Sequence, residues 1–261
     1  MAAHPRAALI TGASTGIGAT YADRLARRGT DLVLVARDLA RLDAVASRLR
    51  VETGRQVDVV QADLTSSSDL RRIERRLAED DRIELLVNNA GAVLQGGFAD
   101  ADLDRQENLI QLNIVAMTRL TGAVIPRFLA RGGGSIVNLA SVVALAPEIP
   151  FGIYGATKAY ALTFSQSLQA EFGSRGIFVQ AVMPGATRTE IWERSGRDVN
   201  ALKAVMEVGA MVDAALAGFD RREPVTIPAL EDEGLWEKFV AARRAMLPSV
   251  QKADVATRYR T

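Results

Sequence analysis

Short apolar runs alternate with longer amphipathic segments along the chain. The runs have the length of β-strands, at residues 7–10, 31–35, 57–60, 85–87, 135–139, 178–182 and 225–227. The central runs are apolar on both faces, as expected of strands that helices cover on each side. The pattern therefore predicts about seven strands in a sheet that is buried on both faces.

Helical periodicity marks the segments between these runs. Residues 37–50 carry apolar side chains at three- and four-residue spacing, with Arg and Asp on the opposite side. Residues 69–77, 102–129 and 154–172 are predicted as further helices, and Pro126 is expected to kink the longest near its end. Repeated β-α-β units predict an α/β fold with a mainly parallel sheet and right-handed crossovers. The sequence contains no low-complexity linker or tandem repeat, so we expect one domain over residues 1–261.

Composition narrows the possible chemistry. Hydrophobic residues make up 48% of the chain, enough for a buried core, and the net charge of +1 gives no strong attraction to nucleic acid or membranes. The absence of cysteine excludes disulfides, thiolate catalysis and cysteine-ligated zinc. The single histidine, His4, cannot build a catalytic triad or a multi-histidine metal site, so we expect no metal. We see no leader-like segment and no uncharged apolar run near ~20 residues, and therefore expect a cytoplasmic protein.

A glycine-rich stretch, TGASTGIG at residues 11–18, directly follows the first predicted strand. Glycine permits backbone angles that are closed to other residues and lets the backbone approach a bulky anion. The helix that begins near Gly16 would direct its free N–H groups and positive dipole end at that anion. A glycine-rich turn without a ligand is the alternative. The flanking strand and helix favour a dinucleotide diphosphate.

The end of the second predicted strand indicates which dinucleotide binds. Sites that prefer NAD carry an acidic residue here, which accepts hydrogen bonds from the ribose 2′-hydroxyl. This chain has Ala36 and then Arg37, whose guanidinium suits a 2′-phosphate, and Ser14 can add a hydroxyl donor. The alternative is a surface Arg37 paired with Asp38. We predict NADP(H) as the cofactor. Asp63, after the third strand, is either an acceptor for the adenine amino group or a helix-capping or turn aspartate.

Tyr154 and Lys158 lie four residues apart in a predicted helix, so that their side chains share one face. A free tyrosine has a pKa of about 10, and lowering it by about 3 requires roughly 4 kcal/mol of differential stabilisation. Lys158 and an oxidised, positively charged nicotinamide are candidate sources. A tyrosine and lysine at this spacing are common by chance. Ser141 strengthens the catalytic interpretation, because it follows the strand at residues 135–139, at the sheet edge where ligands bind.

These residues together resemble the single-domain short-chain dehydrogenase/reductase family over nearly the whole chain. The matching features occur in the family's order and spacing: TGASTGIG at residues 11–18, NNAG at residues 88–91, Asn113, Ser141, Tyr154, Lys158, Pro184, Gly185, Thr187 and Thr189. The resemblance implies one Rossmann-type, doubly wound parallel sheet with helices on both faces. No motif residue departs from the family's usual type, so an active enzyme is expected.

The resemblance also implies a role for each matching residue. Tyr154 would be the general acid in reduction and the general base in oxidation, Ser141 would orient the substrate carbonyl, and Lys158 would bind the nicotinamide ribose and depress the Tyr154 pKa. Asn113 would hold a water that links Lys158 to solvent. Three glycines would line the diphosphate, three NNAG residues would border the adenosine ribose, and two threonines would contact the carboxamide side of the nicotinamide. The full set of predicted cofactor-binding residues is Gly12, Ser14, Thr15, Gly16, Ile17, Gly18, Arg37, Asp63, Leu64, Asn89, Ala90, Gly91, Tyr154, Lys158, Pro184, Gly185, Thr187 and Thr189.

Structural explanations remain open for several of these residues. Asn88 and Asn89 can cap a strand, Asn113 can be a kink residue inside a helix, and Thr187 and Thr189 can be helix N-caps.

The substrate side is less specific. Residues 92–98, 142–151 and 188–218 are candidate covering loops, and the last, with Ile191, Trp192, Met206 and Met211, resembles a helical lid. An apolar pocket is indicated by Val142, Val143, Leu145, Pro147, Ile149 and Phe151, which can also simply pack beneath the lid. We expect a small, uncharged, hydrophobic carbonyl or alcohol substrate.

Assembly and alternative functions complete the predictions. The resemblance implies a homodimer or homotetramer, with residues 102–129 and 154–172 at one interface. The tail at residues 231–261 is expected to pack on a neighbour or on the lid, with its last ten residues poorly ordered. The favoured function is an NADP(H)-dependent oxidoreductase. The alternatives are a dinucleotide-sensing protein without catalysis, and an isomerase or dehydratase of the same family.

Overall fold

The computed structural model describes residues 4–94, 98, 102–149, 151–194 and 198–260. Internal contacts divide the chain into two units, Met1–Pro228 and Ala229–Thr261. The first unit holds the sheet and its helices, and the second holds one long helix. The expectation of a single domain over residues 1–261 stays a prediction.

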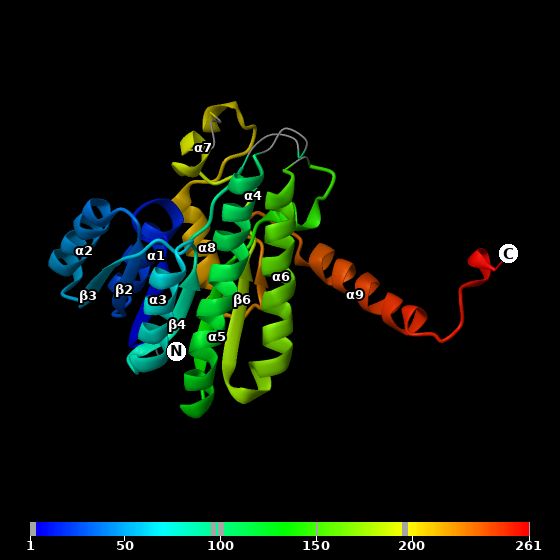
Figure 1. Ribbon diagram of the computed structural model, residues 1–261, viewed down its shortest axis with the longest axis horizontal. Helices are drawn as coiled ribbons and strands as arrows, with labels where there is room; N and C mark the ends of the chain where they lie inside the picture. The colour runs from blue at the N-terminus through cyan, green and yellow to red at the C-terminus, as the bar shows by residue number, and fades with distance from the viewer. Residues whose placement is uncertain (1–3, 95–97, 99–101, 150, 195–197, 261) are drawn as a thin grey trace. The chain divides into compact units, whose positions relative to one another are not determined.

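The first unit is built on a seven-stranded parallel sheet with the order β3-β2-β1-β4-β5-β6-β7 (Figure 1). β1 pairs with β2 on one side and with β4 on the other, so the strand order reverses between β1 and β4. All seven apolar runs form strands, which confirms the doubly wound parallel α/β fold. Their bounds are Ala7–Thr11, Asp31–Ala36, Val57–Gln61, Ile83–Asn88, Gly134–Leu139, Ile177–Val182 and Val225–Thr226 for β1 to β7.

Helices cover both faces of this sheet. On one face α1 (Gly16–Arg27), α2 (Leu39–Thr53) and α8 (Val208–Asp220) pack against one set of alternating strand residues. On the other face α3 (Ser67–Glu79), α5 (Met117–Ala130) and α6 (Ile153–Phe172) pack against the other set. Leu32 and Leu34 therefore belong to one hydrophobic cluster and Val33 and Val35 to the other, as the two-residue period of a strand requires.

The long helical stretch before β5 is not a uniform α-helix. α4 (Leu103–Ile110) passes into a π-helical turn at Gln111–Ala116, and α5 then continues through Pro126 to Ala130. Such a turn inserts an extra residue into the helix and often marks a functional position. Among the described residues, the stretch Leu103–Ala130 is long and apolar enough to cross a membrane. Four of its apolar side chains, Leu120, Val124, Phe128 and Ala116, are buried in the cluster beneath α5.

The expected lid at residues 188–218 divides into two parts. Its first part contains the short helix α7 (Ile191–Arg194) and a 3₁₀ turn at Val199–Ala201, and residues 195–197 lie outside the described residues. Its second part is α8, in which Met211 is fully buried in the main core, and Met206, just before this helix, packs against that core. Apolar side chains that complete a core cannot also serve as a mobile cover, so a lid can extend only over the first part.

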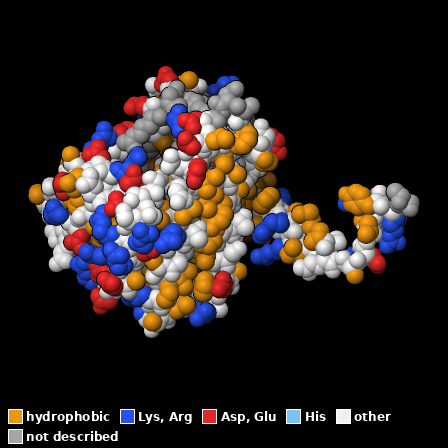
Figure 2. All heavy atoms as spheres, in the orientation of Figure 1, with side chains coloured by type: hydrophobic (Ala, Val, Ile, Leu, Met, Phe, Trp, Pro, Cys, Tyr) orange, Lys and Arg blue, Asp and Glu red, His pale blue; other side chains and the backbone are white. Residues whose placement is uncertain are grey.

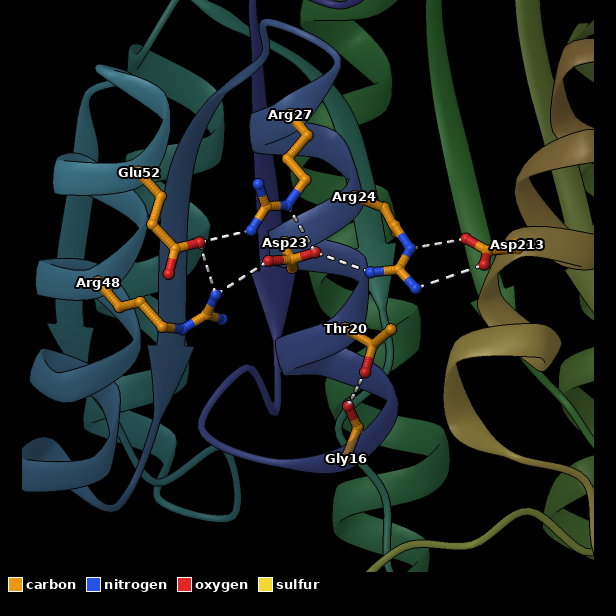
Figure 3. A network of polar contacts seen from close by, with 8 residues as sticks. All are labelled: Gly16, Thr20, Asp23, Arg24, Arg27, Arg48, Glu52 and Asp213. Atoms are coloured by element: carbon orange, nitrogen blue, oxygen red, sulfur yellow. Dashed lines mark hydrogen bonds and ion pairs between the residues drawn. The ribbon is translucent and has the colours of Figure 1, made fainter.

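An ion-pair network joins α1 to its two neighbouring helices (Figure 3). Asp23 of α1 accepts from Arg24, Arg27 and Arg48, the last of which lies on α2, and Arg24 also binds Asp213 of α8 at 2.7 Å. Burial opposes the charge of Asp23, but the three guanidinium hydrogen bonds hold the pKa of Asp23 below its usual range. The network therefore fixes α1 between α2 and α8.

The second unit is one long helix followed by a short tail. α9 spans Glu233–Val250 and begins at the N-cap Asp232, whose side chain accepts from the Gly234 N–H. Trp236 and Phe239 stack with ring centroids 5.4 Å apart. No residue of α9 is buried, and the predicted packing of this tail on a neighbour or on the lid stays a prediction.

Candidate functional site

One cavity of about 820 Å³ opens at the carboxyl ends of the central strands, where the strand order reverses. This is the position at which doubly wound sheets bind their ligands. The residues that line the cavity come from positions between Gly12 and Leu202 in the sequence. Nearly all predicted site residues line it: Gly12, Ser14, Thr15, Gly16, Ile17, Arg37, Asp63, Leu64, Asn89, Ala90, Gly91, Ser141, Tyr154, Lys158, Pro184, Gly185, Thr187 and Thr189.

The glycine loop provides a close backbone approach at one end of this cavity. Gly12 and Gly16 have φ of +66° and +54°, which other residues rarely adopt. A Cβ at Gly16 would lie 3.1 Å from Thr189 Cγ2, so a side chain here would crowd the loop after β6. α1 begins at Gly16 with no acidic residue in its first turn and no side-chain hydrogen bond from its N-cap, Thr15. Its positive end is therefore suited to an anion.

Gly18 lies behind this loop rather than on the cavity wall. A Cβ here would lie 2.3 Å from the Gly12 carbonyl oxygen and 2.5 Å from Asn89 Nδ2. Its glycine is needed for close packing of α1 against the strand ends. The expectation that it lines the diphosphate together with Gly12 and Gly16 stays a prediction.

Asn89 fastens the glycine loop to the end of β4. Its Nδ2 donates to the carbonyl oxygens of Thr11 at 2.8 Å and Gly12 at 3.1 Å. The Thr11 hydroxyl accepts in return from the backbone N–H groups of Asn89 and Ala90, at 3.0 and 2.9 Å. Asn88 points instead into the core, where its Nδ2 donates to Asn138 and Thr121. These two asparagines thus hold the sheet edge together.

Arg37 stands exposed at the adenosine end of the cavity. The alternative pairing with Asp38 is not formed: the Asp38 carboxylate caps α2 through the Arg41 N–H at 3.0 Å and lies 3.4 Å from Arg41 Nε. Asp63 adopts the turn role, since its Oδ1 accepts from both the N–H and the hydroxyl of Thr65, at 2.9 and 2.7 Å. Because Arg41 engages the neighbouring Asp38 carboxylate, the Arg37 guanidinium favours a phosphate at this position.

Ser141, Tyr154 and Lys158 converge at the other end of the cavity. Lys158 is 8% exposed, its Nζ donates to the Leu139 carbonyl at 2.7 Å, and it lies 5.7 Å from the Tyr154 ring centroid. The Ser141 hydroxyl donates to the Pro184 carbonyl oxygen at 3.3 Å, and it lies near enough to the Tyr154 phenol to favour the phenolate. A phenol, an ammonium and a hydroxyl are thus assembled as the helix periodicity and the strand end predict.

Burial governs the protonation of this pair. It raises the pKa of Tyr154 to about 12, against a lowering effect of the Ser141 hydrogen bond, and it lowers the pKa of Lys158 to about 8. The expected depression of the Tyr154 pKa by Lys158 is therefore not produced by the protein side chains, because burial disfavours the charged form of both groups. At neutral pH the phenol keeps its proton and the ammonium keeps its charge, which suits a proton donor.

Asn113 lies in the π-helical turn and is 2% exposed. Its amide exchanges two hydrogen bonds with the backbone of Ala92, at 3.0 and 3.1 Å, and donates a third to the Thr157 hydroxyl at 3.0 Å. A Cβ at Gly91 would lie 3.2 Å from Asn113 Oδ1 and 3.7 Å from Lys158 Nζ. Asn113 is thus a bridging residue beside Lys158 rather than part of the cavity wall.

The loop after β6 closes the nicotinamide side. The Thr187 hydroxyl donates to the Gly185 carbonyl at 3.1 Å, and the Thr187 carbonyl accepts from Trp192 Nε1 at 2.7 Å. Thr189 donates to the same carbonyl at 3.4 Å. Both threonines lie on the cavity wall and stabilise this loop through their hydroxyls.

The catalytic end of the cavity is mostly apolar. Two of the six expected apolar residues, Leu145 and Pro147, lie off the cavity wall, because the 3₁₀ turn at Val142–Leu145 directs the chain away. Residues 95–97 and 150 of the expected loops lie outside the described residues. The described apolar lining consists of Val93, Leu112, Val142, Val143, Ile149, Phe151, Ile191, Trp192 and Leu202.

Sequence reasoning missed two features of this site. Glu190 lies on the cavity wall and pairs with Arg41 Nη1 at 2.5 Å, across 149 positions of sequence. Thr157 is fully buried against Asn113. No local pattern marks Glu190. The position of Thr157 between Tyr154 and Lys158 does indicate that it lies close to the catalytic residues.

Comparisons with known proteins agree with this geometry. The short chain dehydrogenase family model matches residues 6–200. A solved short-chain dehydrogenase from Sphingobium yanoikuyae, in complex with NADPH, is 57% identical, with a TM-score of 0.96 over 97% of this chain and 99% of that chain. A bulky-bulky ketone specific alcohol dehydrogenase from Comamonas testosteroni is 50% identical, with a TM-score of 0.92 over 99% of this chain and 100% of that chain.

A curated relative matches over a shorter range. The 17-beta-hydroxysteroid dehydrogenase type 3 of Homo sapiens is 36% identical over 185 residues, which is 70% of this chain and 59% of the human protein. The family match covers strands β1 to β6, the glycine loop, and the helix that carries Tyr154 and Lys158. The chain therefore belongs to the short-chain dehydrogenase/reductase family of oxidoreductases.

Proposed function

We propose that this protein is an NADP(H)-dependent oxidoreductase that moves a hydride between the nicotinamide and the carbonyl or carbinol carbon of a hydrophobic substrate. One observation carries the proposal: Ser141, Tyr154 and Lys158 meet at the apolar end of the cavity whose other end is formed by the glycine loop and Arg37.

The residues present fit a dinucleotide phosphate. Gly12 and Gly16 carry no side chain and leave the backbone bare at the start of α1, where a diphosphate would accept from N–H groups. At the adenosine end, Arg37 would take the 2′-phosphate. The Sphingobium relative in complex with NADPH supports the same cofactor for this chain.

The side chains of this chain supply the proton and the orientation. Bound nicotinamide would supply or accept the hydride at the substrate carbon. Ser141 holds the substrate oxygen beside the Tyr154 phenol, which is protonated at neutral pH and gives its proton to that oxygen in reduction. Lys158, held by the Leu139 carbonyl, places a positive charge beside the phenolate that forms. Oxidation reverses these transfers and requires the phenolate, so we expect it to be faster at alkaline pH.

The apolar lining supports an uncharged substrate with hydrophobic groups. Phe151 packs edge-on against the Tyr154 ring, with centroids 5.9 Å apart, and Trp192 bounds the opposite loop. Burying a carboxylate against such a surface without a cationic partner is unfavourable. The Comamonas relative, specific for bulky-bulky ketones, supports a ketone with two large substituents.

The central test compares wild type with Tyr154→Phe. The variant should bind NADPH with unchanged affinity and lose turnover by at least about a hundredfold, because general acid catalysis contributes 10²–10⁴-fold. Full activity in Tyr154→Phe would show the acid–base role to be wrong. NADPH binding without turnover across a broad carbonyl panel would favour a dinucleotide-sensing protein.

A substrate panel tests the proposed preference for bulky, uncharged ketones. Diaryl and aryl-alkyl ketones, acetone and 2-oxo acids would be followed by NADPH absorbance, with bulky uncharged ketones expected to react fastest. Turnover of anionic substrates alone would contradict the apolar assignment. Product formation without stoichiometric loss of NADPH would indicate an isomerase or dehydratase.

The proposal includes a homodimer or homotetramer that uses the face formed by α5 and α6. Figure 2 shows hydrophobic side chains gathered over these helices on one face of the molecule. Exposed apolar patches of this kind mark protein interfaces. Light scattering coupled to gel filtration should give a mass of two or four chains of 28.1 kDa, and a monomer would contradict it.

A further inference from the structure

A chain of buried hydrogen bonds runs from the end of β4 to the catalytic turn of α6. Asn113 Nδ2 donates to the Ala92 carbonyl at 3.1 Å and to Thr157 Oγ1 at 3.0 Å. Thr157 Oγ1 donates in turn to the Tyr154 carbonyl at 2.8 Å. Thr157 is 0% exposed and Asn113 is 2% exposed, so water cannot replace these partners.

The Thr157 hydroxyl and the Ala92 backbone together fix which way the Asn113 amide faces. A hydroxyl carries one proton, and here it is donated to the Tyr154 carbonyl, which can only accept. The hydroxyl oxygen can therefore only accept from Asn113, so the amide must present its nitrogen to α6. The amide oxygen then faces the Ala92 N–H, on the side that borders Gly91 and Lys158.

The first turn of α6 begins without a side-chain cap. Its N-cap is Gly152, which has no side chain, makes no side-chain capping bond and has a φ of +50°. The turn carries no acidic residue that would complement the helix dipole. Tyr154 lies in this turn. The hydrogen bonds of Thr157 connect the turn to Asn113, which lies in the π-helical turn before α5 and is bonded to the Ala92 backbone.

We propose that Thr157 is a positioning residue, whose hydroxyl anchors the first turn of α6 to the Asn113 amide, and which thereby sets Tyr154 and Lys158 for proton transfer. This rests on the proposed oxidoreductase function. Thr157 does not line the cavity and touches neither substrate nor cofactor. Its effect must therefore appear in kcat and depend on Asn113.

The experiment compares Thr157→Val, which keeps the shape and removes the hydroxyl, with Thr157→Ser, which keeps the hydroxyl. Thr157→Val removes both hydrogen bonds of the hydroxyl and should lower kcat at least about tenfold, while the KM for NADPH stays within twofold. Thr157→Ser should retain at least half of the wild-type kcat. The matched control is Thr118→Val on α5, which loses an equivalent bond to the Ile114 carbonyl and a contact with the Tyr160 hydroxyl, and should leave kcat unchanged.

A double-mutant cycle with Asn113→Ala tests the route of the effect. If Thr157 acts through Asn113, adding Thr157→Val to Asn113→Ala should lower kcat by less than twofold more. Wild-type kcat in Thr157→Val, or independent losses in the cycle, would overturn the proposal. If Thr157→Val does not fold, Thr157→Ala replaces it, and failure of both to fold would make Thr157 merely structural. Retained activity in Tyr154→Phe would instead overturn the proposed function.

Discussion

Replacing Gly18 with alanine tests whether this glycine serves packing or the diphosphate. The added methyl group would lie 2.3 Å from the Gly12 carbonyl oxygen and 2.5 Å from Asn89 Nδ2. These two atoms are themselves hydrogen-bonded at 3.1 Å, so the methyl group would enter the space that this bond occupies. One of the contacting atoms belongs to the backbone and cannot rotate away.

The size of the effect follows from these contacts. Overpacking a tight site costs about 1–3 kcal/mol, and the lost hydrogen bond adds about 1 kcal/mol. We therefore expect the free energy of unfolding to fall by about 3 kcal/mol. For a chain of this size that loss lowers the melting temperature by roughly 6–12 °C. Displacement of Gly12 should also weaken NADPH binding about tenfold, because the loop backbone is what meets the anion.

Differential scanning fluorimetry with and without NADPH measures both effects. Gly122→Ala is the matched control: it lies within α5, and a Cβ there has nothing within 4 Å, so alanine should stabilise the helix by up to about 1 kcal/mol. An unchanged melting temperature of ligand-free Gly18→Ala, together with lost NADPH binding, would refute the packing argument. Gly18 would then line the diphosphate site.

Cofactor preference, pH dependence and the ion pairs of α1 give further tests. Arg37→Asp should raise the KM for NADPH by about 10–100-fold and improve the use of NADH, and unchanged kinetics with both would show that Arg37 does not meet the 2′-phosphate. Burial lowers the pKa of Lys158 to about 8, so the unfolded chain binds more protons between about pH 8 and 10.5 and wild-type stability should rise through that window. The free energy of unfolding of Lys158→Met, measured in urea at pH 7, should therefore exceed that of wild type by on the order of 2–3 kcal/mol. A difference that does not shrink toward pH 10 would contradict this reasoning. Asp23→Asn leaves three arginines around a neutral amide, and should lower stability by about 1–2 kcal/mol at low salt and less at 1 M NaCl, since the guanidinium groups are partly exposed. An equal loss at both salt concentrations would exclude charge as its cause.

Local pattern determined the elements and the principal site residues. Seven apolar runs predicted seven strands because a parallel strand buried on both faces must be apolar throughout. The glycine loop was recognised because it directly follows the first strand, and Tyr154 and Lys158 because four residues of helix place them on one face. Each of these inferences concerns residues close in sequence, or the shared edge at which parallel strands end.

The tertiary structure alone decided what depends on contacts between distant segments. Asn113 meets Thr157 across 44 positions, and Arg41 meets Glu190 across 149. Only part of the expected lid can cover the cavity, because α8 packs its apolar side chains into the core against the sheet. Burial raises the pKa of Tyr154, an effect that the sequence could not supply, because desolvation depends on how deeply the fold encloses a group and residue spacing carries no measure of that depth.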